Sequence, residues 1–111
     1  MCHRLECQRR TGSALSVAAF YDRKCVTVTH GAPRTYSRDS ASGFAVTFHF
    51  CPDCGSNLWW EPARLPGLIG VAVGAFADPA FPMPARTVWT ENKHDWLPFP
   101  ETIPWHRKNP A

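Results

Sequence analysis

Five cysteines carry most of the chemistry that the 111-residue sequence offers: Cys2, Cys7, Cys25, Cys51 and Cys54. Cys51 and Cys54 are separated by a proline and an aspartate, and a glycine follows the second cysteine. A tight turn of this composition lets two thiolates face one ion, which is half of a tetrahedral zinc site. A redox pair is the rival interpretation of a lone C-x-x-C, but it requires a βαβ setting. Because strand-like patterns flank the turn, we favour zinc.

The cysteine count and the N-terminal segment argue against disulfides. The first ten residues are polar and basic and do not resemble a signal peptide, so we expect a reducing, cytoplasmic location. An odd number of cysteines leaves one thiol unpaired in any complete disulfide scheme. Cys25 lies in an alternating segment, where we expect a small buried hydrophobic side chain.

Short strands are predicted on both sides of the C-x-x-C turn. Phe44–Phe50 alternates apolar and polar residues, and Asn57–Trp60 follows the turn. Leu68–Phe76 is nearly all apolar and is expected to be the most buried strand. Further candidates are Cys25–Thr29, Thr35–Ser37, Arg86–Trp89 and Ala14–Phe20, the last as a strand or a single helical turn. No run of about 10 to 12 residues has a helical period, which predicts one mainly β domain over residues 1–111.

Composition narrows the function classes. Hydrophobic residues make up 44% and charged residues 19%, which is typical of a folded chain. The apolar runs are short, so we expect no membrane helix. The net charge is only +3 and the basic residues are scattered, so we expect no nucleic-acid partner. Eleven prolines favour short strands joined by fixed loops, and a metal would help so small a domain to fold.

Two motifs resemble those of a known family. Residues 2–13 read CHRLECQRRTGS and resemble the C-H-C-x-x-C-[QR]-x-x-T-G-S motif of the glutathione-dependent formaldehyde-activating (GFA) family, which includes centromere protein V. Residues 50–56 read FCPDCGS and are similar to that family's F-C-x-x-C-G-S. Residues 73–79, 84–89 and 93–96 also resemble its C-terminal pattern, so the resemblance covers nearly the whole chain.

The resemblance implies a β-tent fold with two zinc sites and a carbon–sulfur lyase activity. The implied reaction joins formaldehyde to glutathione, giving S-(hydroxymethyl)glutathione, so glutathione or its hydroxymethyl adduct is the expected partner. It also implies that Cys2 and Cys7 are catalytic and bind one zinc, and that Cys51 and Cys54 bind the other. Zinc would hold a thiol as thiolate near neutral pH and polarise the aldehyde carbonyl.

The sequence departs from the family pattern at two places. Arg4 stands where the family has the middle cysteine, and a guanidinium cannot bind a cation. The upstream strand that carries a further C-x-C is missing, so the domain is expected to be N-terminally shortened. We therefore keep the alternative of a non-catalytic zinc-binding or interaction domain. An exposed sheet edge left by the missing strand makes a homodimer plausible.

Three outcomes for the metal follow from these departures. In the first, Cys51 and Cys54 bind zinc with substitute ligands, such as histidines. In the second, all four cysteines, Cys2, Cys7, Cys51 and Cys54, bind one zinc ion. In the third, neither cysteine pair binds zinc. Among the histidines, we expect His3 to be exposed or in a loop, and His49 to lie on the face opposite the apolar side of its strand. Arg9 and Arg10 are interpreted as a solvated basic edge, with attraction of a glutathione carboxylate as the sharper alternative.

Overall fold

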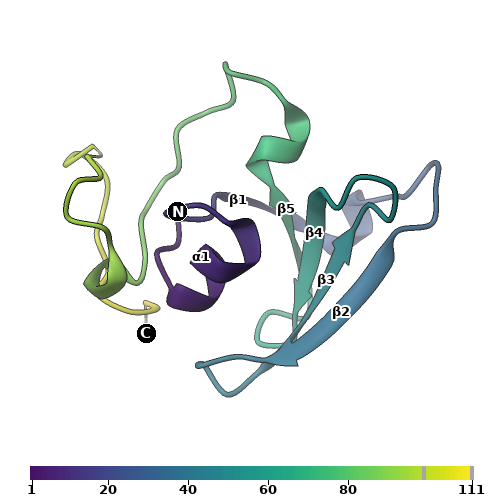
Figure 1. Cartoon of the computed structure of the whole chain (residues 1–111), viewed down its shortest axis with the longest axis horizontal. Helices are drawn as coiled ribbons and strands as arrows, with labels where there is room; N and C mark the ends of the chain where they lie inside the picture. The colour runs from purple at the N-terminus through teal and green to yellow at the C-terminus, as the bar shows by residue number, and fades with distance from the viewer. Residues whose placement is uncertain (99, 111) are drawn as a thin grey trace. The chain divides into compact units, whose positions relative to one another are not determined.

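Five antiparallel strands in one sheet dominate the computed structural model, which describes residues 1–98 and 100–110. The strands are β1 (Ala18–Asp22), β2 (Arg34–Asp39), β3 (Ala45–Phe50), β4 (Asn57–Pro62) and β5 (Leu68–Ala72). They are arranged in the order β1-β5-β4-β3-β2 (Figure 1). Helical structure in the described residues is limited to α1 (Leu5–Thr11) and three 3-10 turns, η1 (Arg23–Cys25), η2 (Val73–Phe76) and η3 (Thr90–Asn92). The predicted mainly β class is confirmed.

The described residues divide into two compact units. One unit holds residues 19–77 and contains most of the sheet. The other holds residues 1–18 together with the described residues from 78 onward, and it contains α1. None of the helices in the described part of the chain is long and apolar enough to cross a membrane.

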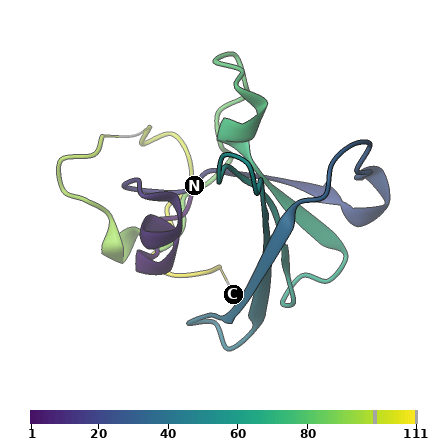
Figure 2. The same ribbon diagram turned by 45° about the vertical axis from the view of Figure 1, so that its right-hand side comes forward.

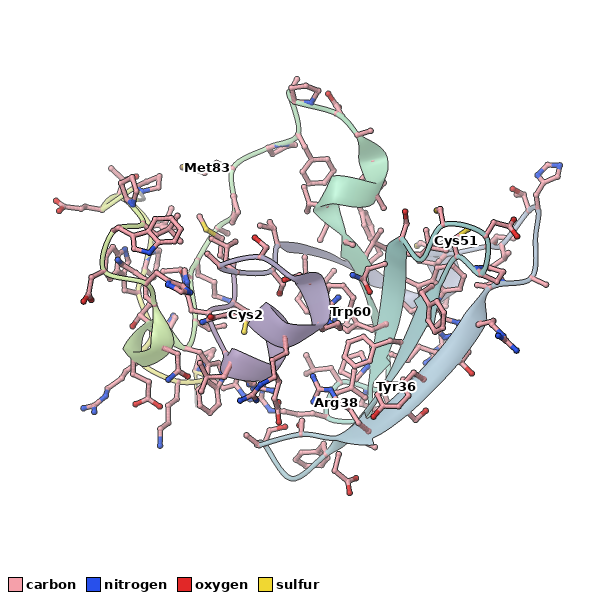
Figure 3. The ribbon with its side chains drawn as sticks, in the orientation of Figure 1. Cys2, Tyr36, Arg38, Cys51, Trp60 and Met83 are labelled. Carbon is pink, nitrogen blue, oxygen red and sulfur yellow. The ribbon has the colours of Figure 1, made fainter. Side chains whose placement is uncertain are left out.

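A row of residues crosses the sheet through the core of the first unit, which contains Phe48, Trp60 and Ile69, and exposed Tyr36 lies at the end of this core row. The register places Tyr36 opposite Phe48, Phe48 opposite Trp60, and Trp60 opposite Gly70. The rings of Phe48 and Trp60 lie 6.2 Å apart between centroids, and both residues are buried. A Cβ on Gly70 would lie 2.6 Å from the indole nitrogen of Trp60, so only glycine leaves room for that ring. Figure 3 labels Tyr36 and Trp60 on β2 and β4, and Figure 2 shows these strands from a second direction.

The second unit is held together by pairing between its distant ends. Cys2 pairs with Ser16 in the antiparallel sense and with Val88 in the parallel sense, and Thr87 pairs with Trp105. The helix α1 ends at Gly12, which has the left-handed conformation that glycine adopts without strain (φ 65°). Among the residues of this unit that the structure describes, His3, Ser16, Thr87 and Ile103 are buried.

Several strand boundaries differ from the prediction. The strand predicted over Cys25–Thr29 is wrong, because η1 takes up Arg23–Cys25 and residues 26–29 form no strand. The side chain of Asp22 accepts a hydrogen bond from the Lys24 backbone N–H, which caps η1 and turns the chain early. Cys25 is exposed, so the prediction that it is buried is also wrong.

The other differences concern the ends of elements. The predicted strand over Leu68–Phe76 stops at Ala72, and η2 follows until Ala77 takes a left-handed conformation (φ 49°). Arg86–Trp89 is not a strand, since only isolated bridges form at Thr87 and Val88. The helix α1 was not predicted, because seven residues are too few to show a helical period.

Candidate functional site

Cys2 and Cys7 form a close thiol pair in the unit that contains α1. The Cys2 backbone exchanges two hydrogen bonds with Ser16, at 2.9 Å and 2.8 Å, which fix the position of its side chain. Cys7 lies in the first turn of α1. The two sulfur atoms share a hydrogen bond and lie 3.5 Å apart. The structure therefore brings together the two cysteines that the family motif singles out.

The surroundings of the pair favour a thiolate on Cys7. The hydrogen bond with the Cys2 thiol lowers the pKa of Cys7 to about 6, against the effect of burial, and the Ser16 hydroxyl and the charges of Arg10 and Arg4 lower it further. The same hydrogen bond and burial raise the pKa of Cys2. The two thiols therefore ionise as a pair, with the first thiolate favoured on Cys7.

Arg4 is held in a defined position beside the pair. Its guanidinium lies over the ring of Trp89, with the central carbon 4.5 Å from the ring centroid, and one of its nitrogens is 3.6 Å from the Glu6 carboxylate. The Trp89 indole in turn donates a hydrogen bond of 3.0 Å to Asn109. At the position where the motif that the sequence resembles has a third cysteine, this chain has a positive charge packed on an aromatic ring.

His3 is wholly buried, so the prediction that it is exposed is wrong, although it does lie outside regular secondary structure, between Cys2 and the start of α1. Its backbone N–H donates to the Val88 carbonyl, which ties this stretch to a segment far away in the sequence. The imidazole Nε2 lies 2.9 Å from the Thr87 hydroxyl. Burial lowers the pKa of His3 to about 4, with nearby positive charges including Lys93 contributing, so His3 is neutral at pH 7.

Gln8 links the start of α1 to a segment far away in the sequence. Its amide nitrogen donates to the carbonyls of His3 (2.8 Å) and Asn92 (3.1 Å), and its amide oxygen lies 2.9 Å from Nε2 of His94. The sequence argument did not assign a role to Gln8, Ser16 or Thr87. Only Gln8 could have been singled out from the sequence, by its place in the cysteine motif. The partners of Ser16 and Thr87 are distant in the sequence, so no local pattern points to them.

Cys51 and Cys54 lie in the tight turn that was predicted, between β3 and β4 (Figure 3 labels Cys51). The Gly55 N–H donates to the Cys51 carbonyl at 2.8 Å, and Gly55 has a left-handed conformation (φ 73°). The Cys54 sulfur lies 3.1 Å from the Ser56 hydroxyl. Hydrogen bonds from Ser56, and one with Cys51, lower the pKa of Cys54. Such a turn stabilises thiolates, as a zinc-binding turn must.

His49 is engaged by other residues of the sheet. Its Nε2 lies 2.7 Å from the Glu61 carboxylate, and its ring stacks on Trp59 at 4.5 Å between centroids. Because His49 lies opposite Trp59 and Phe48 opposite Trp60, His49 is on the face away from the core row, as predicted. The hydrogen bond from His49, and then Arg23, lowers the pKa of Glu61.

The thiol pairs fit a zinc ion only in part. Two thiolates on one tetrahedral zinc lie roughly 3.8 Å apart, given Zn–S bonds of about 2.3 Å, and the Cys2–Cys7 distance of 3.5 Å is close to that value. Across residues 1–98 and 100–110, no group of three or more His, Cys, Asp or Glu side chains is arranged to hold a metal. The Cys2–Cys7 pair therefore matches two corners of a tetrahedron, and at either pair the remaining ligands of a zinc ion must come from elsewhere.

The fold and the cysteine pairs define a small, mainly β thiol domain with a C-x-x-C-G turn between two antiparallel strands. Residues 1–92 match the family model for the glutathione-dependent formaldehyde-activating enzyme, GFA, and the chain belongs to that family. The family resemblance seen in the cysteine motifs is thereby confirmed. No curated protein matches the sequence.

Proposed function

We propose that this chain is a carbon–sulfur lyase that joins formaldehyde and glutathione, with Cys2 and Cys7 at the reacting centre. The observation that carries the proposal is the pair of sulfurs 3.5 Å apart, with the pKa of Cys7 lowered to about 6. The reaction adds the glutathione thiolate to the aldehyde carbon, and the Cys7 thiolate can take up the proton that the glutathione thiol gives up. Membership of the GFA family supports the same substrate class.

Zinc is the cofactor that we propose for this chemistry. Cys2 and Cys7 would bind one zinc ion at the reacting centre, and Cys51 and Cys54 would bind a second zinc ion at the turn between β3 and β4. When bound, zinc keeps thiols ionised near neutral pH and polarises an aldehyde carbonyl. The chain's own groups prepare these ligands: the Arg4 backbone N–H donates to Cys2, and the Ser16 hydroxyl donates to Cys7.

The contact between Arg4 and Trp89 favours a second candidate, a non-catalytic zinc-binding domain of the same family. A catalytic zinc usually has three protein ligands and one open position. Here the third ligand position is occupied by a guanidinium that is packed on Trp89 at 4.5 Å. In this alternative the turn at Cys51 and Cys54 binds zinc for stability, and the chain has no turnover.

The test measures adduct formation by exchange NMR with glutathione and isotopically labelled formaldehyde. A protein-free sample is essential, because the two reactants also combine without an enzyme. The lyase proposal predicts faster exchange with zinc-loaded protein than without protein, and loss of the gain when zinc is removed with a chelator. An exchange rate equal to the protein-free rate, together with a melting temperature that rises with zinc, would support the non-catalytic candidate instead.

We also propose that the two units form one cytoplasmic domain that pairs with a second copy. The edge strands of the sheet are β1 and β2, and β2 is largely exposed. An exposed edge offers unpaired N–H and C=O groups to a partner strand. Light scattering on a size-exclusion column checks the pairing, since a monomeric mass over the micromolar range would contradict it.

A further inference from the structure

The Cys2–Cys7 pair is a dithiol as well as half of a metal site. Its sulfurs lie 3.5 Å apart, and a disulfide bond is about 2.05 Å long, so they need to approach by roughly 1.5 Å. Both residues are partly buried rather than enclosed, so a small oxidant has access. The third thiolate that would draw the pair toward a metal is replaced by Arg4.

The local structure tells which sulfur moves. The Cys2 backbone is tied to Ser16 by two hydrogen bonds and lies next to Val88, so Cys2 is fixed. Cys7 belongs to a helix of only seven residues that has no buried residue. Rotation of the Cys7 side chain, with a small shift of this helix, is the simplest movement that closes the gap.

We propose that Cys2 and Cys7 form a reversible disulfide by exchange with a low-molecular-weight disulfide such as glutathione disulfide. One thiolate of the pair attacks a sulfur of the oxidant, forms a mixed disulfide and releases the first glutathione thiolate. The second cysteine then attacks the protein sulfur of the mixed disulfide and releases the second glutathione. The pair loses two electrons and two protons, and one glutathione disulfide becomes two glutathione thiols. This chemistry goes beyond adduct formation and does not depend on it.

The arrangement of basic residues makes this disulfide easy to detect. Trypsin cleaves after Arg4, so Met1–Arg4 carries Cys2 and Leu5–Arg9 carries Cys7 on separate peptides. Metal-free, reduced protein of residues 1–111 is incubated in glutathione buffers of rising oxidised fraction and then alkylated in acid. Metal-free protein is used because zinc and the oxidant compete for the same sulfurs. Mass spectrometry of the digest then measures the linked pair of peptides.

We expect the linked pair to rise with the oxidised fraction and to exceed any peptide cross-linked through Cys25 by about tenfold, because the second thiol is already adjacent. Cys25→Ser should leave the yield unchanged, whereas Cys7→Ser should convert Cys2 to a mixed disulfide with glutathione. Separate alkylated or glutathione-bearing peptides at every buffer ratio, with no linked pair, would overturn the proposal. The wild-type digest decides this even if Cys7→Ser fails to fold.

Discussion

Buried His3 makes the stability of this protein sensitive to mild acid. Its side chain has no exposed surface, and its pKa is lowered from 6.5 to about 4, mainly by burial. Between these two values the unfolded chain binds a proton at His3 and the folded chain does not. The free energy of unfolding therefore falls as the pH drops from about 6.5 to about 4. Below that range, protonation of His3 causes no further loss of stability.

The expected size of the effect follows from the two pKa values. The full shift corresponds to about 3 kcal/mol, since one pKa unit is worth about 1.4 kcal/mol. At pH 5 about 2 kcal/mol of this is already lost, while most carboxylates are still ionised. A loss of this size is a large fraction of the stability of a small domain.

Urea unfolding of the wild type and of His3→Gln at pH 7.5 and pH 5 measures the contribution of His3 to the pH dependence of stability. The wild type should lose about 2 kcal/mol more than His3→Gln between the two pH values. His30→Gln serves as the matched control, because His30 is exposed, and it should behave like the wild type. Equal losses in the wild type and His3→Gln, or an imidazole NMR titration of His3 centred near its ordinary pKa, would refute the reasoning.

Three further predictions test other parts of the structure. Gly70→Ala should destabilise the protein by about 1–3 kcal/mol in urea unfolding, because the added Cβ meets the indole of Trp60, whereas the Cβ of Gly74→Ala enters open space and should cost less in the same assay. Alkylation of Cys7 in metal-free protein should reach half its maximal rate near pH 6, and a midpoint near that of free glutathione would contradict the assigned hydrogen bonds. Arg4→Cys should raise zinc affinity by supplying a third thiolate, as measured by competition with a chromogenic chelator, while Arg4→Lys should not.

The features that were predicted from sequence are those determined by near neighbours. The turn at Cys51 and Cys54 follows from its proline and glycine, and the flanking strands follow from alternation over a few residues. These local signals also placed His49 on the correct face. Local patterns therefore predicted the C-x-x-C turn and the strands at the centre of the sheet.

The features that were missed depend on residues distant in the sequence. His3 is buried because its backbone pairs with Val88 and its ring meets Thr87, and neither partner is visible in the first ten residues. Cys25 alternates like a strand residue, yet the cap at Asp22 turns the chain before any pairing begins. The close approach of Cys2 to Cys7 was implied by the family motif, but the fixing of Cys2 by Ser16 and Val88 was not.

Comparison of the Cys7→Ser and Cys25→Ser variants in the exchange NMR assay tests the central claim most directly. Both variants lose one thiol, but only the first loses a sulfur of the pair whose atoms lie 3.5 Å apart. We predict that zinc-loaded Cys25→Ser accelerates adduct formation as the wild type does, and that Cys7→Ser falls to the protein-free rate. Full acceleration by Cys7→Ser would contradict the assignment of the reacting centre to Cys2 and Cys7.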